Sequence, residues 1–279
     1  MTVCIAGKCQ TGIIAMCDRM ISTGHYSADD MALKFRDIHR EWHAMFAGND
    51  VSRIKPLIDK AKKRLTGAKG SLAEVEDAMR ASFHEELIQK QTDLVLSRYG
   101  LTMKEFLDTG LRRFGETQFT AIKYQLDQIN LECAFLVYGL DDNNTEHIFT
   151  VEDPGIACNH DLYGFWSIGS GSNRALSSLF FHDFRQALPE WKAVYLIAEA
   201  KFMAEGGEVG EETLVMIQRN DGTNQGSLDI DGIKGLWNKS GRPKIPRNAE
   251  AVIMKSIEKE FFTVRFPTPS TSEKSKSGQ

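Results

Sequence analysis

The 279-residue sequence lacks any long hydrophobic run. No apolar stretch approaches the roughly 20 residues that a helix needs to cross a bilayer. The N-terminus, MTVCIAGKCQTG, has no basic segment followed by a long apolar one, which a secretory signal would show. We therefore expect no membrane partner and a cytoplasmic protein.

An excess of charge of one sign is also missing. The chain carries 34 basic and 38 acidic residues, and its formal net charge is −4. This balance offers no general attraction for nucleic acid, which we exclude as a partner.

Cysteine is sparse as well, and three of the five cysteines, Cys4, Cys9 and Cys17, lie close to the N-terminus. Such a set suits buried reduced thiols better than a disulfide framework.

Hydrophobic residues make up 42% of the chain, enough for one large folded domain or two small ones. Short β-branched and aromatic runs predict strands, and apolar residues at 3- and 4-residue spacing predict helices. The predicted strands cover residues 2–7, 12–18, 41–48, 133–141, 146–153, 164–172 and 212–220. The predicted helices cover residues 51–65, 71–97, 173–187 and 191–204, with helical pieces over 101–129 that break at Gly110 and Gly115.

The order of these elements is strands, helices, strands, two helices and a strand. This is neither strand–helix alternation nor an all-β pattern, so it predicts an α+β fold in which paired helices cover sheet faces. The last residues, 267–279, are polar and rich in Pro, Ser and Lys, which predicts a disordered tail.

Thr2 is the first residue that could carry chemistry. Its side chain is small, so we expect Met1 to be removed, which would leave a free α-amino group and a hydroxyl on one residue. A free terminal amine has a pKa near 8 and can act as a base at neutral pH. Taken alone, however, Thr2 is more simply an ordinary second residue.

Three further residues could support this chemistry. A Lys34 ammonium held by the Asp18 carboxylate near the amine would lower the pKa of that amine. Gly48 offers a backbone amide free of side-chain obstruction, as an oxyanion hole requires. The alternative for Asp18 and Lys34 is a surface ion pair that contributes little.

Together these residues resemble the proteasome β-subunit family of N-terminal nucleophile (Ntn) hydrolases, which includes the simpler bacterial ring proteases. In that family the mature chain begins at the catalytic threonine, and a strand ending in aspartate, a lysine and an Ala-Gly pair follow. Thr2, the AMCD of residues 15–18, Lys34 and the AGND of residues 47–50 match these motifs. SIGSGS resembles the family's segment whose first serine lies beside the threonine amine, which maps onto Ser170.

The resemblance implies a four-layer αββα sandwich, with two antiparallel sheets between helix layers, over residues 2–218. An extra helical segment near 98–128 makes the chain longer than the family's core. Residues 219–266 would form a C-terminal extension that packs on the domain or contacts another subunit.

The resemblance also implies a threonine peptidase that needs no metal or organic cofactor. Thr2 would form the acyl-enzyme, with Asp18, Lys34 and Ser170 as the other catalytic residues and Gly48 at the oxyanion. The substrate would be a peptide or polypeptide, cleaved inside a homo-oligomeric ring; the sequence gives no sign of whether an ATP-dependent unfoldase acts with it. The implied substrate pocket is apolar and would favour cleavage after hydrophobic residues; its lining would be Ile21, Ala32, Phe46 and Ile54.

The sequence departs from the family after the predicted helix 191–204. A D-x-x-S-G motif is usual there, but this chain has AEGGEVGEE, with Val209 before Gly210 and no serine. Glu205 and Glu208 are the candidates for its supporting role. Two other interpretations stay open: an inactive scaffold subunit of a ring, and an Ntn amidase that acts on a small amide.

Overall fold

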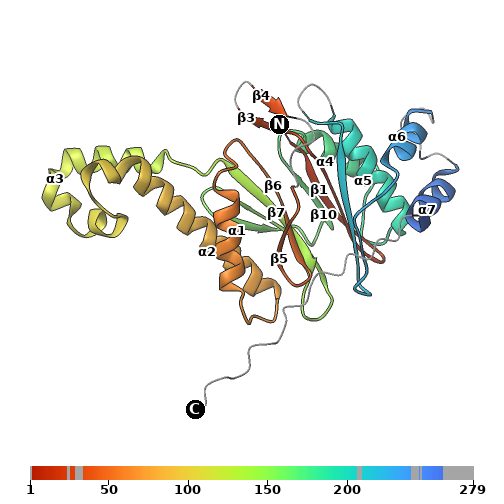
Figure 1. The fold of residues 1–279 in the computed structure, drawn as a ribbon, viewed down its shortest axis with the longest axis horizontal. Coiled ribbons are helices and arrows are strands. Elements are labelled where there is room, and N and C mark those ends of the chain that lie inside the picture. The colour runs from red at the N-terminus through yellow and green to blue at the C-terminus, as the bar shows by residue number, and fades with distance from the viewer. Residues whose placement is uncertain are drawn as a thin grey trace, which may run out of the picture.

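The computed structural model describes residues 2–23, 26–28, 34–205, 209–239, 245 and 247–259. Over these residues the chain is an α+β protein with two antiparallel five-stranded sheets (Figure 1). The strand order is β10-β1-β2-β11-β12 in the first sheet and β5-β6-β7-β8-β9 in the second. A short pair, β3 (Ile21–Thr23) and β4 (Tyr26–Ala28), stands apart from both.

The first sheet is built around the N-terminal hairpin. Its strands are β1 (Cys4–Cys9), β2 (Gly12–Asp18), β10 (Phe165–Ile168), β11 (Thr213–Arg219) and β12 (Asn224–Gln225). Every residue of β1 and β2 is buried. This explains why both strands are almost continuously apolar, because both faces of the sheet are covered.

The second sheet contains the predicted strands 133–141 and 146–153, which pair as a hairpin. Its strands are β5 (Arg36–His39), β6 (Trp42–Gly48), β7 (Cys133–Leu140), β8 (Glu146–Glu152) and β9 (Ile156–Asn159). In the turn between β7 and β8, the Asp141 carboxylate accepts hydrogen bonds from the backbone N–H groups of Asn143 and Thr145. These bonds close the turn locally, as the bonds of aspartate side chains commonly do.

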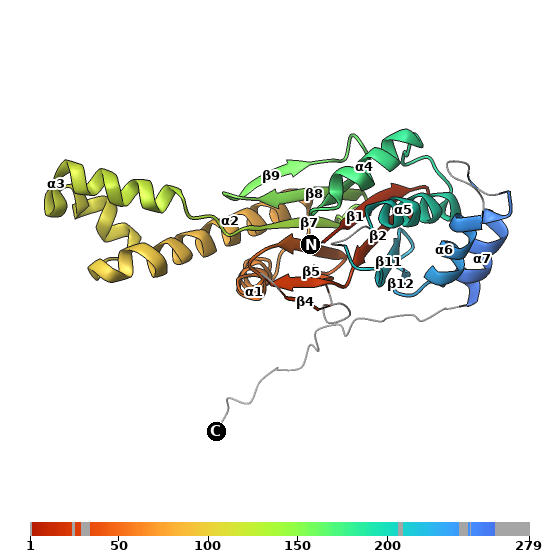
Figure 2. The ribbon, with the colours of Figure 1, turned by 90° about the horizontal axis from the view of Figure 1, so that it is seen from above.

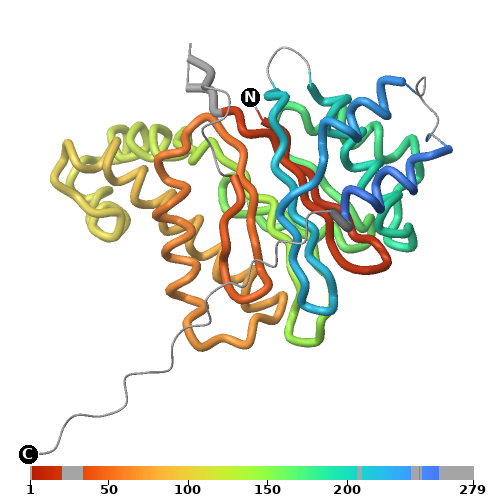
Figure 3. Tube along the Cα trace, turned by 45° about the vertical axis from the view of Figure 1, so that its right-hand side comes forward, coloured from red at the N-terminus to blue at the C-terminus, as the bar shows by residue number. Residues whose placement is uncertain are grey.

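The two sheets share one core. Small residues of β1 and β2, such as Ala6 and Ala15, lie in a cluster with Met45 of β6 and Leu136 of β7. Because neighbouring side chains of a strand point to opposite faces, the alternate residues of the same strands face outward. Small side chains of the first sheet therefore meet larger ones of the second, such as Leu136 and Tyr138, and Figure 3 shows the trace of the two sheets.

Helices cover the two outer faces. Ile5 and Ile14 of the first sheet pack in one cluster with α4 (Ser172–Phe181) and α5 (Glu190–Ala204). Phe135 of the second sheet packs in another cluster with α1 (Ile54–Arg64) and α2 (Leu72–Gln91). Figure 2 shows these helix pairs on opposite sides of the molecule.

A helical arm extends from the end of α2. The helix passes into a π-helical turn (Thr92–Leu96) and a 3₁₀ turn (Ser97–Tyr99), and α3 (Met103–Asp127) follows. Figures 1 and 2 both show α3 projecting away from the sheets. The arm has a small core of its own; its buried members are Val95, Leu96, Leu101, Phe106, Ile122 and Leu126.

The predicted break at Gly115 is confirmed, because its φ of 73° lies in the left-handed region. The predicted break at Gly110 is wrong. A Cβ at Gly110 would lie 3.0 Å from the Phe106 ring and 3.1 Å from the Phe119 ring. The glycine there allows two aromatic side chains to approach the helix rather than ending it.

Two helices follow the first sheet, and the pattern analysis did not predict either. These are α6 (Ile230–Lys239) and α7 (Ala249–Lys259), whose residues Ile233, Trp237 and Ile253 share the core cluster of α5. Residues 260–279, with the predicted disordered tail, lie outside the described residues. In the part of the chain that the structure describes, no helix is long and apolar enough to cross a membrane.

Candidate active site

The candidate site forms where strands of both sheets end beside Thr2. In the β1–β2 hairpin Cys4 pairs with Cys17, which brings Val3 opposite Asp18. The Asp18 backbone N–H donates to the Val3 carbonyl (3.2 Å), and the Val3 N–H donates to Asp18 Oδ1 (2.8 Å). Local hairpin register therefore holds the Asp18 carboxylate next to the first residues of the chain.

Ser170 reaches Thr2 from the other side of β1. Cys4 pairs with Ile168 of β10, so the turn after β10 lies beside Thr2. The Thr2 nitrogen lies 3.1 Å from Ser170 Oγ, and the Gly171 N–H donates to the Thr2 carbonyl at 3.1 Å. Gly169 has a φ of 93°, and a Cβ there would collide with the Thr2 carbonyl, so glycine is needed at this position.

Lys34 joins Thr2 to Asp18. Its Nζ donates to Thr2 Oγ1 at 2.6 Å and to Asp18 Oδ1 at 2.8 Å. The exposed fraction of the side chain is 2% for Lys34 and 0% for Asp18. A buried ion pair is tolerated only when hydrogen bonds compensate for lost hydration. The Asp18 carboxylate meets this condition, because it also accepts from the Val3 and Met20 N–H groups.

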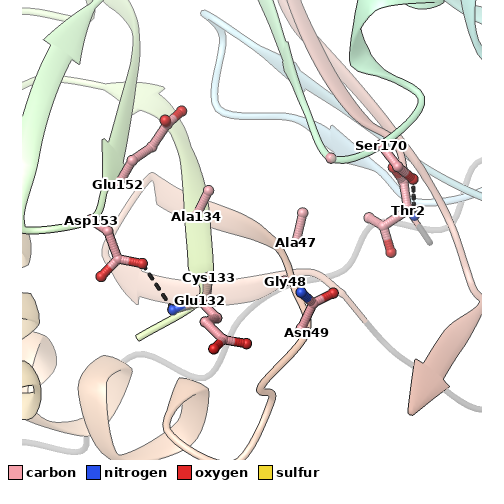
Figure 4. Close-up of a pocket in the computed structure, with 11 residues that line it drawn as sticks. Thr2, Ala47, Gly48, Asn49, Glu132, Cys133, Ala134, Glu152, Asp153 and Ser170 are labelled. Atoms are coloured by element: carbon pink, nitrogen blue, oxygen red, sulfur yellow. Dashed lines mark hydrogen bonds between the residues drawn. The ribbon is translucent and has the colours of Figure 1, made fainter. Parts of the chain in front are cut away.

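Gly48 lies at the end of β6, between two cavities that both reach Thr2. The larger has a volume of about 370 Å³, and Ser170 also lines it. The smaller, of about 10 Å³, is lined by Lys34 and by the apolar side chains of Met20, Phe46 and Val51. Gly48 therefore places its backbone where the two cavities meet, and Figure 4 shows it among the residues that line the larger one.

The larger cavity has an acidic wall opposite Thr2. Glu132, Glu152 and Asp153 line it, and the side chains of Glu132 and Asp153 are drawn on that wall in Figure 4. Asp153 is held in place by hydrogen bonds of 2.8 Å from the N–H groups of Leu131 and Glu132. None of the described residues that line this cavity is basic. Its electrostatic potential is therefore negative.

Cys133 lines the same cavity but is not placed to act as a thiolate. Burial, and next the charge of Asp153, raise the pKa of the Cys133 thiol to about 12. The thiol therefore stays protonated at neutral pH, and only a thiolate is strongly nucleophilic. Among the described side chains of this cavity the hydroxyls of Thr2 and Ser170 remain, and Thr2 Oγ1 is the one that accepts a hydrogen bond from the Lys34 ammonium.

The four residues expected at the substrate pocket fall in different places. Phe46 lines the smaller cavity beside Thr2. Ile54 is 3% exposed and packs with α1 and the second sheet; it is not among the described residues that line either cavity at Thr2. Ile21 lies in β3, but its side chain, like the whole of Ala32, is outside the described residues.

The structure also adds residues that sequence reasoning missed. Lys201 of α5 is completely buried and forms an ion pair with Glu205, one of the two residues considered in place of the D-x-x-S-G motif. The other, Glu208, lies outside the described residues. The signal for Lys201 was available, because it is a lone lysine in the apolar run VYLIAEAKFMA.

This arrangement can activate a hydroxyl. The Lys34 cation beside Thr2 Oγ1 stabilises negative charge that develops there, and the Asp18 carboxylate orients that cation.

In the described part of the chain, no group of three or more His, Cys, Asp or Glu side chains is placed to hold a metal ion. No family model matches the sequence, and no curated protein matches it. The chemistry is therefore inferred from geometry.

Proposed function

We propose that this protein is a threonine-type N-terminal nucleophile hydrolase that cleaves peptide bonds through an acyl-enzyme on Thr2. The observation that carries the proposal is the contact of Lys34 Nζ with both Thr2 Oγ1 (2.6 Å) and Asp18 Oδ1 (2.8 Å). Ser170 Oγ, 3.1 Å from the Thr2 nitrogen, completes the surroundings of the residue.

The architecture supports the same proposal. Two five-stranded antiparallel sheets share a core, and helices cover their outer faces. We assign this arrangement to the four-layer αββα sandwich of the Ntn hydrolases. Thr2 lies just before the beginning of β1, where two cavities reach it.

The proposed reaction begins with the removal of Met1, which frees the Thr2 amine. Thr2 Oγ1 attacks the scissile carbonyl carbon while the amine accepts the hydroxyl proton, directly or through water. Lys34 and the Gly48 amide stabilise the oxyanion. The C–N bond then breaks and the leaving amine takes the proton, which leaves an ester on Thr2. Water hydrolyses this ester with the same amine as base.

The larger cavity indicates what the substrate carries. The smaller one, lined by Met20, Phe46 and Val51, has a volume of only about 10 Å³, which is the space of a single water molecule and too small for a substrate side chain. The acidic wall of the larger cavity suits a cationic group close to the scissile bond. We further propose that the subunits form a closed ring with Thr2 facing an inner chamber, which would limit access to unfolded chains or peptides.

Mass spectrometry and a peptide panel test the proposal. The purified protein should lack Met1 and hydrolyse fluorogenic peptides, and Thr2→Ala should abolish turnover while its circular dichroism spectrum is unchanged. Thr2→Ser should keep partial activity, because a serine hydroxyl can occupy the same position. Unchanged turnover in Thr2→Ala would refute the mechanism. Retention of Met1 without hydrolysis would favour the inactive scaffold, and hydrolysis of small amides alone would favour the amidase.

A further inference from the structure

Lys201, near the end of α5, is a buried cation outside the Thr2 cluster. Its exposed fraction is 0%, and its Nζ donates to Glu205 Oε1 (2.5 Å) and to the carbonyl oxygens of Gly210 (3.0 Å) and Glu211 (2.5 Å). An ammonium has three N–H donors, so every donor has an acceptor. Lys201 therefore joins the end of α5 to the chain that leads into β11.

A second lysine, Lys234, pairs with the two carboxylates near Lys201, those of Glu205 and Glu211. Lys234 of α6 donates to Glu205 Oε2 at 2.7 Å, and it lies 3.3 Å from Glu211 Oε2. Burial lowers the pKa of Lys201, although the Glu205 carboxylate opposes this shift. The three hydrogen bonds that Lys201 donates offset the cost of burying its charge.

The chain that Lys201 holds packs directly under the Thr2 site. A Cβ on Gly171 would lie 3.0 Å from Val3 Cβ and 3.1 Å from both Ala204 Cβ and Val209 Cγ2. Val209 therefore lies against the turn that contains Gly171. The N–H of Gly171 in this turn donates to the Thr2 carbonyl. A few residues later, Thr213 pairs with Asp18 at the start of β11. Residues 209–213 therefore contact the Thr2 site at two places, the turn at Gly171 and Asp18.

We propose that Lys201 is a positioning residue for the Thr2 site, which holds residues 209–213 so that Val209 supports the Gly171 turn and Thr213 supports Asp18. It takes the place of the absent D-x-x-S-G motif with a lysine on the helix instead of an aspartate and a serine in the loop. The inference rests on the proposed function, since the effect on catalysis needs a working Thr2.

The decisive variants change Lys201 in two ways. Lys201→Met keeps the volume of the side chain but removes its three donors, and Lys201→Arg keeps a cation with several donors. Lys192→Met is the matched control, because Lys192 lies on α5 near its beginning, away from Thr2. Lys201→Met should lower kcat about 100-fold with little change in KM, because a small misplacement of the reacting groups costs about this much. Lys201→Arg should restore part of kcat, and Lys192→Met should match the wild type.

Hydrogen exchange supplies a readout that does not depend on activity. In Lys201→Met the Gly171 amide should exchange faster, while amides in the β6–β7 ladder should keep their wild-type protection. A folded Lys201→Met with wild-type kcat and unchanged exchange at Gly171 would overturn the inference. If Lys201→Met does not fold, the milder Glu205→Gln, which removes the carboxylate that Lys201 binds, takes the same test. If the wild type has no hydrolytic activity, the proposed function fails, and the exchange at Gly171 alone decides the role of Lys201.

Discussion

The Lys34 ammonium lies 2.6 Å from the Thr2 hydroxyl oxygen, although the two residues are 32 positions apart in the chain. The same ammonium is 2.8 Å from the Asp18 carboxylate, and neither charged side chain is more than 2% exposed. Because little water reaches this pair, the charge of Lys34 acts on the hydroxyl with less screening than it would at the surface.

Lys34→Ala should therefore lower the rate of peptide hydrolysis about 100-fold or more, the cost of losing a preorganised charge at a reacting oxygen. Removal of the cation should also raise the pKa of the Thr2 amine. The measurement is the pH–rate profile, in which the limb that reports the base should move to higher pH.

Lys8→Ala is the matched control for Lys34→Ala. Lys8 is also a buried lysine, paired with Asp161 at 2.6 Å, but it lies near the opposite end of β1. Its loss should cost about 3 kcal/mol of stability, as the breaking of a buried ion pair does, and leave kcat unchanged. Equal losses of kcat in the two variants would make Lys34 a structural residue only.

The acidic cavity should give the enzyme a preference for cationic substrates. Peptides with lysine near the scissile bond should be cleaved about tenfold faster than their glutamate counterparts at low salt, because Glu132, Glu152 and Asp153 line the cavity. Glu132→Gln and Glu152→Gln should each reduce this ratio, and added salt should reduce it too. Glu116→Gln, which removes an equal charge from α3, should leave it unchanged. A ratio of one for the wild type would contradict the prediction.

The free energy of unfolding should fall as the pH rises above neutrality, because His147 then loses its proton and its ion pair with Asp161. Burial alone would lower the pKa of His147, but the hydrogen bond and charge of Asp161, 2.6 Å away, raise it above the ordinary value of 6.5. A raised folded pKa stabilises the protein fully below the unfolded pKa, and this stability is lost as the pH rises through the folded value. His147→Gln should remove the corresponding fall in melting temperature as the pH rises above the unfolded pKa of about 6.5. An identical pH dependence in the variant would show that another group is responsible.

The helical arm should take part in subunit contacts. Leu107 and Leu111, one helical turn apart on α3, are 65% and 55% exposed, and Tyr124 on the same helix is 66% exposed. Replacing both leucines with glutamine should weaken self-association in analytical ultracentrifugation without loss of helix content, while Arg112→Gln should have no effect. A wild-type protein that is a stable monomer and still hydrolyses peptides would refute the ring and favour the small-amide hydrolase.

The sequence by itself determined much of the local structure. The β-branched runs at residues 2–7 and 12–18 gave the first hairpin, and the capping box at Ser71 and Glu74 gave the start of α2. Such signals are carried by residues a few positions apart, so they are readable without a fold. The sequence also indicated which side chains belong together: the structure brings Thr2 into contact with Lys34 and Ser170, and Asp18 into contact with Lys34.

Tertiary structure alone decided the features that depend on distant segments. The sequence pattern suggested a helix break at Gly110, but the helix continues there because Phe106 and Phe119 pack against the glycine. Ile54 was expected in the substrate pocket, and the structure places it in the core cluster of the second sheet. Glu132 precedes β7 and Glu152 is the last residue of β8, and they meet at one cavity only because β7 and β8 pair. Lys201 is a site-supporting cation only because α5 ends under the turn at Gly171. Contacts of this kind are set by the packing of whole layers, which no local run of residues encodes.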